Sequence, residues 1–275
     1  MGVIGLVVHE GRAAAVEAAE ALRTNLLQDG HEAGPTAEGV TADLVVSVGG
    51  DGTFLRAAHL ASGIGCPVLG VKVGRLGFLT EVEPRDALDL IRSALEGRAR
   101  VEERLAVTAE PAPGSGFEPQ WGLNEIMVEK QTRHRLVRLA VEVDGTYVTT
   151  FSADGVIVAT PTGSTAYSFS ARGPIVTPGV PCMVLTPIAA HMVFDRSFVL
   201  EAHQAVTLEV MGEESGVLSA DGRASIELPV GTRVQIRAAL ERPARFVRRG
   251  DRDDFLARVR EKFELPGDPG VGPGV

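Results

Sequence analysis

The sequence is poor in several features that mark specialised classes of protein. It has two cysteines, Cys66 and Cys182, and it contains no CxxC pair and no Cys/His cluster. These counts argue against a disulfide framework and a structural zinc site, and we expect two buried, reduced thiols and no metal held by the protein. No long block of Lys and Arg occurs and the net charge is −9, so nucleic acid is not expected as the main partner.

Long apolar runs of the kind that cross a membrane are also missing. The longest candidate, residues 181–194, is broken by Thr186, Pro187 and His191. It therefore falls short of the roughly 20 apolar residues that a spanning helix needs. The N-terminus has no basic segment ahead of its first apolar run, as a signal peptide would. We expect a cytoplasmic protein with no membrane partner, and we expect His191 to be a buried core histidine.

Three common nucleotide and hydrolase signatures are absent. The chain has no GxxxxGK[ST] loop, no GxGxxG after its first strand, and no GxSxG elbow. A Walker-type phosphate loop, a dinucleotide fingerprint and a serine-hydrolase nucleophile therefore have no support.

The first hundred residues alternate between strand and helix patterns. Continuous apolar runs predict buried strands, and spaced apolar positions predict helices. The strands are expected at 3–8, 44–48 and 66–71, and the helices at 11–30, 53–63 and 84–97. This alternation is typical of parallel βαβ units, so we predict an α/β domain over residues 1–100.

After residue 100 the pattern of apolar and polar residues changes. Apolar and polar residues alternate, and turn pairs such as Asp144-Gly145 separate the runs, which predicts an all-β domain over residues 101–248. Helical spacing returns at 253–263, and we expect a helix within residues 249–265 that packs back on the first domain. The Pro/Gly-rich residues 266–275 are expected to be a disordered tail.

The segment GGDGT at residues 49–53 joins a predicted strand to a predicted helix. Glycines let a ligand approach the backbone, and the helix start offers N–H groups to phosphate. Asp51 inside such a cradle suits two tasks: taking a proton from a hydroxyl nucleophile, or holding Mg²⁺ through water. The alternative is an ordinary turn with Asp51 near the N-cap. Arg56, one helical turn later, is either a cation for phosphate or a solvated residue.

A second polar cluster covers residues 152–174. Hydroxyl groups crowd around Gly163, and Asp154 precedes a short apolar strand. Hydroxyls and backbone N–H groups in a glycine turn are good neutral ligands for phosphate and ribose oxygens. The alternative is a polar loop with helix caps. Upstream, Asn124-Glu125 interrupts apolar neighbours, either at an exposed strand end or within a site.

Together these stretches resemble the NAD kinase family. The resemblance rests on GGDGT at 49–53, LGFL at 76–79, Asn124-Glu125, and above all DGVIVATPTGSTAYSFSA at 154–171. It extends through LTPIAAH at 185–191 to Asp221-Gly222. GGDGT alone also resembles segments of diacylglycerol kinases and phosphofructokinases, but the long segment at 154–171 is specific to NAD kinases.

The resemblance implies an α/β N-terminal domain, an all-β C-terminal domain, and phosphate transfer from ATP to the 2′-hydroxyl of the adenosine ribose of NAD, giving NADP. Asp51 would be the general base, and Asn124 and Glu125 would bind the nicotinamide-side ribose. The binding residues expected in all are Gly50, Gly52, Thr53, Arg56, Asn124, Glu125, Arg133, Asp154, Thr162, Thr165, Ala166, Tyr167, Ser168, Ser170 and Arg223.

The same resemblance implies Mg²⁺ as the companion of ATP, ATP or polyphosphate as the donor, and a homodimer or homotetramer. Three residues depart from the family pattern: Lys72 where Asn is usual, Arg172 where Gly is usual, and Arg223 where a ligand-touching Gln is common. Each adds positive charge near the expected site. Two other readings stay open: a dinucleotide-binding regulator without efficient catalysis, and a related kinase of a lipid or sugar hydroxyl.

Overall fold

A computed structural model describes residues 1–74, 77–80, 82–112, 116–191, 194–223, 225–250 and 255–266. The chain divides into two compact units. Unit 1 comprises Met1–Glu102 and Arg245–Val275, and unit 2 comprises Glu103–Ala244. The expected tail falls mainly on residues 267–275, and Leu76 of the LGFL segment also lies outside the described residues.

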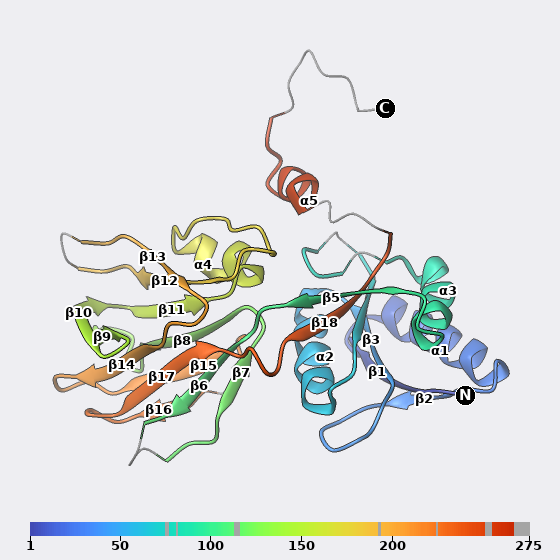
Figure 1. Ribbon diagram of the computed structural model, residues 1–275, viewed down its shortest axis with the longest axis horizontal. Coiled ribbons are helices and arrows are strands. Elements are labelled where there is room, and N and C mark those ends of the chain that lie inside the picture. The colour runs from blue at the N-terminus through green and yellow to red at the C-terminus, as the bar shows by residue number, and fades with distance from the viewer. Residues whose placement is uncertain are drawn as a thin grey trace. The chain divides into compact units, whose positions relative to one another are not determined.

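Unit 1 is built on a six-stranded sheet with the order β2-β1-β3-β4-β18-β5 (Figure 1). The strands are β1 (Val3–Val8), β2 (Glu32–Pro35), β3 (Leu44–Gly49), β4 (Val68–Lys72), β5 (Arg100–Arg104) and β18 (Ala244–Arg248). β1 pairs in parallel with β2 and β3, and β4 pairs in parallel with β3 and β18. Because β1, β3 and β4 are parallel neighbours, their carboxyl ends lie at one edge of the sheet.

Helices α1 (Ala13–Gln28) and α3 (Pro84–Leu95) share a core on one face of this sheet. Helix α2 (Asp51–Ile64) lies on the other side (Figure 1). Its Phe54 packs edge to face on Phe246 of β18, with ring centroids 4.8 Å apart. The last helix, α5 (Phe255–Lys262), is followed by Phe263, whose ring centroid lies 5.6 Å from that of Phe78.

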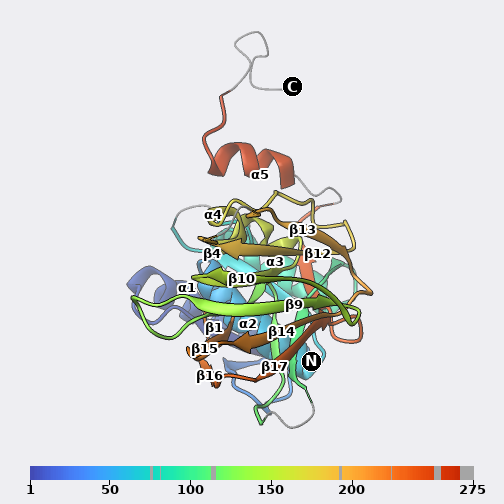
Figure 2. The ribbon, with the colours of Figure 1, turned by 90° about the vertical axis from the view of Figure 1, so that its left-hand side faces the viewer.

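Unit 2 consists of two six-stranded sheets, ordered β10-β9-β14-β17-β6-β7 and β13-β12-β11-β8-β15-β16. Figure 2 shows β10, β9, β14 and β17 of the first sheet side by side. The strands are β6 (Val107–Pro111), β7 (Gln120–Gly122), β8 (Glu125–Lys130), β9 (Val137–Val143), β10 (Thr146–Ala153), β11 (Gly155–Ala159), β12 (Cys182–Ile188), β13 (Phe198–Glu201), β14 (Val206–Met211), β15 (Gly216–Ala220), β16 (Ile226–Leu228) and β17 (Arg233–Ala238). Neighbouring strands in both sheets are antiparallel.

One apolar core joins the two sheets of unit 2. It takes Leu139 and Phe151 from the first sheet and Val128 and Val158 from the second, all fully buried. Alternating patterns put every second side chain into this core, and burying a side chain of this size contributes about 1.5–3 kcal/mol. Between β11 and β12 the chain forms a 3₁₀ turn, η1 (Thr162–Thr165), and a short helix, α4 (Tyr167–Ser170).

The predicted fold class is confirmed: an α/β unit with parallel strands and an all-β unit. The sequence pattern missed β2, whose four residues, EAGP, carry no strand signal at the edge of the sheet. The expectation for His191 was wrong, because its side chain is exposed just after β12. Its apolar neighbours belong to the strand, whereas His191 lies beyond the strand's end.

Candidate functional site

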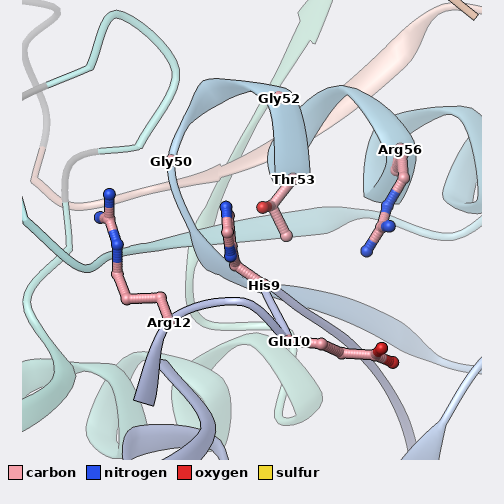
Figure 3. Close-up of a pocket in the computed structure, with 7 residues that line it drawn as sticks. All are labelled: His9, Glu10, Arg12, Gly50, Gly52, Thr53 and Arg56. Atoms are coloured by element: carbon pink, nitrogen blue, oxygen red, sulfur yellow. The ribbon is translucent and has the colours of Figure 1, made fainter. Parts of the chain in front are cut away.

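A cavity of about 460 Å³ opens in unit 1 at the carboxyl ends of β1 and β3. It is lined by His9, Glu10, Arg12, Gly50, Gly52, Thr53 and Arg56 (Figure 3). Gly50, Gly52, Thr53 and Arg56 were expected at the site, and the structure brings all four together. The crevice beyond the carboxyl ends of parallel strands is the usual ligand position in open α/β sheets.

The N-terminus of α2 gives this cavity a positive end without a side-chain cap. The helix begins at Asp51, and its N-cap residue is Gly50, which makes no side-chain cap hydrogen bond. A helix N-terminus carries partial positive charge on its first N–H groups, which attracts an anion. The opening is therefore suited to a phosphate group.

Two arginines flank the cavity, with His9 and Thr53 between them in the view of Figure 3. The Arg12 guanidinium donates to the carbonyl of Val73, and Arg56 Nη2 donates to the Val8 carbonyl over 3.1 Å. The sequence analysis missed His9, Glu10 and Arg12. Their signal was their position directly after the first strand, whose end adjoins the end of β3.

Asp51 is held by backbone groups from another segment. Its carboxylate accepts N–H bonds from Phe78 at 2.9 Å and from Leu79 at 3.1 Å. A Cβ at Gly77 would lie only 2.0 Å from Asp51 Oδ1, so only glycine fits at this position without moving the carboxylate. Asp51 is thus tied to the LGFL segment and does not cap its own helix.

Lys72, the first of the departures, ends β4 beside the glycine loop. Its Nζ lies 3.9 Å from a carboxylate oxygen of Glu83, and its side chain is partly buried. The added positive charge therefore faces a carboxylate within unit 1.

In unit 2, Asn124 lies in the turn that leads into β8. Its carbonyl accepts the N–H of Thr160 over 2.8 Å, and Thr160 Oγ1 donates to the Leu123 carbonyl over 2.6 Å. Gly163 of η1 packs so closely that a Cβ there would lie 2.1 Å from the Asn124 carbonyl oxygen. The Asn-Glu pair and the glycine turn of the long segment, far apart in sequence, thus meet at one end of β11.

Behind this turn lies a buried carboxylate, Asp221, in the turn after β15. It accepts N–H bonds from Leu123 at 2.8 Å, Asn124 at 2.8 Å and Glu125 at 3.1 Å. Burial raises the pKa of Asp221, while these three bonds and the charge of Arg223 oppose that rise. Burial, and then the charge of Asp221, raise the pKa of Glu125 to about 8.

Arg223, another departure, is bound within unit 2. Its Nη1 lies 3.5 Å from Asp221 Oδ2, and its Nη2 donates to the Trp121 carbonyl. Its side chain is 23% exposed. The expectation was a direct ligand contact. The observed bonds connect Arg223 to the Asn124-Glu125 turn through Asp221 and Trp121.

The hydroxyl-rich segment is split between packing and an open cavity. Thr162 and Ser168 are buried, and Ser168 Oγ lies 3.3 Å from Thr186 Oγ1. Thr165 and Ala166 are half-buried. Tyr167 and Ser170 line a cavity of about 440 Å³ in unit 2.

The cavity in unit 2 is also lined by Arg172, Ile188 and Asp195. Arg172 has a φ of 69°. This left-handed conformation favours glycine, which accounts for the usual Gly at this position and makes Arg172 a strained replacement. Of the three departures from the family pattern, Arg172 is the one that lines the cavity of Tyr167 and Ser170.

Asp154 lies just before β11, at the opposite end of this strand from Thr160. Its carboxylate forms an ion pair with Lys130, the last residue of β8. Arg133 follows in the exposed turn after β8, on the side of Asp154 and away from Asn124 and Glu125. The sequence analysis did not single out Lys130, which the antiparallel pairing of β8 and β11 brings to Asp154.

The described residues contain no group of three or more His, Cys, Asp or Glu side chains arranged to hold a metal ion. None of the helices in the described part of the chain is long and apolar enough to cross a membrane. Both cysteines are buried and reduced, and burial raises the pKa of each thiol.

Comparison with known proteins gives matches over both units. Residues 8–99 match the model of the ATP-NAD kinase N-terminal domain, and residues 123–249 match that of the ATP-NAD kinase C-terminal domain. An NAD kinase of Leifsonia xyli subsp. xyli is 41% identical over 97% of this chain and 87% of its own length. NAD kinase 2 of Streptomyces avermitilis is 39% identical over 95% of this chain and 94% of its own length.

Two solved structures share the fold. Yeast NADH kinase, complexed with NADH, aligns with a TM-score of 0.84 and 23% identity over 99% of this chain and 91% of its own. An NAD kinase from Archaeoglobus fulgidus, in complex with ATP, aligns with a TM-score of 0.75 and 26% identity over 96% of this chain and 99% of its own.

Proposed function

The chain belongs to the NAD kinase family, and we therefore propose that it transfers the terminal phosphate of ATP to the 2′-hydroxyl of the adenosine ribose of NAD, giving NADP. The observation that carries this proposal is the cavity of unit 1. There an uncapped helix N-terminus and two arginines lie next to a carboxylate. Phosphoryl transfer depends mainly on positioning and charge neutralisation, and this cavity offers both.

Unit 1 would bind the phosphate donor. Gly50 and Gly52 leave the backbone open to phosphate oxygens, and Thr53 adds a hydroxyl. Arg12 and Arg56 would neutralise the phosphate charge, with His9 between them. Local cations are needed because the chain as a whole carries a net charge of −9 and would repel an anionic donor.

Asp51 would take the proton from the 2′-hydroxyl. The N–H groups of Phe78 and Leu79 fix the carboxylate in one orientation. A carboxylate has about four lone-pair positions, so two N–H bonds leave acceptor capacity for a hydroxyl. Because the transition state of phosphoryl transfer is loose, the carboxylate need only orient the hydroxyl and accept its proton late.

Mg²⁺ would enter with ATP. This ion usually keeps several waters and is held by substrate phosphates with one or two carboxylates, and Asp51 is the carboxylate of the glycine loop. A protein-only cage of three ligands is not required for that role. The ion would supply charge neutralisation on the phosphates, and Arg12 and Arg56 would add to it from the protein.

Unit 2 would bind NAD with groups at the two ends of β11, whose own five residues are buried. Asn124 and Glu125 lie at one end of this strand and Asp154 at the other. Five strand residues span about 17 Å, a length that suits an extended dinucleotide. Tyr167 and Ser170 line the cavity of unit 2, where the tyrosine ring offers a flat surface to a base or the nicotinamide.

Among the other expected ligands, Thr165 and Ala166 would contact the dinucleotide with half-buried groups. Thr162 and Ser168 are buried and would shape the segment from behind. Asp154 and Arg133 would lie toward the far end of the dinucleotide. Arg223 would act through the turn that it supports.

The direct test is incubation of the protein with Mg-ATP and NAD, followed by a coupled assay specific for NADP. We expect NADP to form and its formation to stop when EDTA removes Mg²⁺. Parallel reactions with polyphosphate and with NADH define the donor and the acceptor. Calorimetric binding of NAD without NADP formation from either donor would instead identify a dinucleotide-binding regulator.

We also propose a homodimer or homotetramer, on the strength of the family resemblance alone. Light scattering coupled to size-exclusion chromatography should give a mass of two or four times 29.0 kDa. A mass of one chain at concentrations where the enzyme is active would contradict this.

A further inference from the structure

Asp221 forms hydrogen bonds with the turn that carries Asn124 and Glu125, and we call this bonded arrangement of Asp221 and residues 123–125 the clasp. Its side chain has no exposed surface, and its two oxygens accept the three consecutive N–H groups of Leu123, Asn124 and Glu125. The Asp221 N–H in turn donates to the Glu125 carbonyl over 3.1 Å. Four hydrogen bonds thus connect two segments almost a hundred residues apart.

Arg223 completes the clasp from the other side. It joins the Asp221 carboxylate to the carbonyl of Trp121, two residues before Leu123. A guanidinium can make both bonds at once because its donors are arranged in a rigid fork. The glutamine usual at this position in the family could not supply the positive charge.

Glu125 has a different environment from Asp221: the side chain of Asp221 is fully buried, whereas Glu125 is only partly buried. Its Oε2 atom is sealed from solvent and has no hydrogen-bond partner among the described residues. Negative charge on a carboxylate oxygen that is buried and unpaired is strongly disfavoured, which favours the protonated form of Glu125. The pKa of about 8 follows from this burial and from the charge of Asp221.

The facing groups decide which of the two acids carries the negative charge. Burial raises the pKa of Asp221, but three N–H donors and Arg223 oppose this rise and favour its ionised form, whereas no group among the described residues opposes the rise in the pKa of Glu125. Around Glu125, β11 places uncharged Ala159 opposite it. The uncharged turn η1 abuts the neighbouring Asn124. Asp221 is the charged group whose field acts on Glu125, so the proton belongs on Glu125.

We propose that Asp221 and Arg223 are positioning residues that present Glu125 to the dinucleotide as a neutral carboxyl group able to donate a hydrogen bond. This inference rests on the proposed function, in which Glu125 binds a ribose of NAD. A neutral carboxyl group donates through its O–H and accepts through its carbonyl, whereas a carboxylate only accepts. A neutral group also adds no negative charge beside the pyrophosphate of NAD.

The test is a pH titration of the protein labelled with ¹³C at the glutamate side-chain carboxyls, followed by NMR with and without NAD. Glu125→Gln identifies the resonance of Glu125. We expect its midpoint near pH 8 in the protein alone, far above the ordinary glutamate value of about 4.3. NAD should raise the midpoint further, because the complex uses the protonated form.

Two variants sharpen the titration. Asp221→Asn removes the charge and keeps a carbonyl that can accept N–H bonds, so the Glu125 midpoint should fall. In the protein without substitutions, NAD affinity should decline about tenfold per pH unit above the midpoint, as expected for loss of one proton. Glu125→Gln should abolish this decline, and Glu110→Gln, at an exposed position of β6, should leave it in place.

A Glu125 midpoint in the ordinary carboxyl range would overturn the inference, whether or not the protein makes NADP. A midpoint near 8 that NAD binding leaves unchanged would overturn the proposal that Glu125 donates a hydrogen bond to NAD. The titration of the protein without NAD needs no activity, and no variant beyond the one used for assignment. If NADP does not form but the midpoint is elevated, the proposed function and the hydrogen bond from Glu125 to NAD are wrong. The effect of Asp221 on the pKa of Glu125 would still stand.

Discussion

In unit 1 the polar groups of the candidate site stand at the ends of secondary-structure elements, and His9, Arg12 and Arg56 are exposed. In unit 2 part of the candidate site is packed between strands and turns, where Asn124 and Thr162 are buried, although Tyr167 is exposed at a cavity. Exposed cations can adjust to phosphate chains of different length, at a cost in side-chain entropy. Buried groups are fixed before a ligand arrives, and each must satisfy its neighbours.

The two sites therefore depend on different features of the fold. In unit 1, the order of the strands decides which residues meet at the strand ends. A site inside a sandwich is described by which polar atoms satisfy each other, as Asp221 does for the turn at Asn124. Substitutions in unit 1 should therefore change mainly the contacts with the ligand. Substitutions in unit 2 should also change the pKa values of neighbouring groups and the conformation of the turns.

The largest effect is expected at Asp51. Asp51→Asn should lower the turnover of NADP formation by roughly 10²–10⁴, the usual range for loss of a general base. The affinity for NAD should stay within a few-fold, because the shape of the loop is retained. Steady-state kinetics and NAD titration check both statements, and a fall in turnover of less than about tenfold would remove Asp51 from the role of base.

Gly77→Ala tests whether turnover depends on the position of the Asp51 carboxylate, independently of its charge. The added Cβ would lie 2.0 Å from Asp51 Oδ1, so the carboxylate has to move although it stays ionised. We expect turnover to fall at least tenfold, approaching the effect of Asp51→Asn. Gly34→Ala is the matched control, because no heavy atom lies within 4 Å of its added Cβ. Equal activity of the two glycine variants would show that the orientation of Asp51 is unimportant.

Arg12→Met tests the donor cavity. Loss of a charged hydrogen bond costs about 1.5–3 kcal/mol, so the KM for ATP should rise roughly 10- to 100-fold while the KM for NAD changes little. Arg98→Met is the control, since Arg98 is exposed in unit 1 and pairs with the surface residue Glu96. A similar rise in both variants would indicate a general effect of net charge.

Tyr167→Ala makes the complementary change in unit 2. It removes a ring that is 42% exposed and lines the cavity, so the KM for NAD should rise by about tenfold, as for loss of one stacking contact. The KM for ATP should change much less. Tyr147→Ala, at the other tyrosine of the chain, on β10, supplies the control. If both KM values rose equally, Tyr167 would belong to general packing.

The last of these predictions concerns stability and not activity. The pKa of Glu125 is raised to about 8 in the folded protein, so the folded state binds the extra proton. This contribution to the free energy of unfolding is complete below the ordinary carboxyl pKa and is lost as the pH rises toward 8. Relative to the unsubstituted protein, Glu125→Gln should therefore gain stability between pH 5 and pH 8. Urea unfolding across that range measures it, and a constant difference would contradict the raised pKa.

Much of unit 1 could be predicted from sequence because its signals are local. Apolar runs and helical spacing lie within single elements, and GGDGT spans one strand end and one helix start. His9 and Arg12 were missed because their relevance depends on β1 and β3 being neighbours. β2 was missed because its four residues carry no pattern.

For unit 2, the sequence predicted the all-β fold class but not the strand pairing or the side-chain partners. Alternation identifies strands, but it does not say which strands pair, and the clasp of Asp221 on Leu123 joins residues 98 positions apart. Arg223 was therefore expected to contact a ligand, and its bonds to Asp221 and Trp121 could not be read from a local pattern. The same holds for Lys130, which reaches Asp154 through strand pairing.

We propose that unit 1 binds the phosphate donor and unit 2 binds the dinucleotide. Calorimetric titration of ATP and of NAD into Arg12→Met and Tyr167→Ala tests this division. We expect Arg12→Met to lose affinity for ATP and to keep its affinity for NAD, and Tyr167→Ala to do the reverse. Equal losses for both ligands in both variants would contradict the division of binding between the two units.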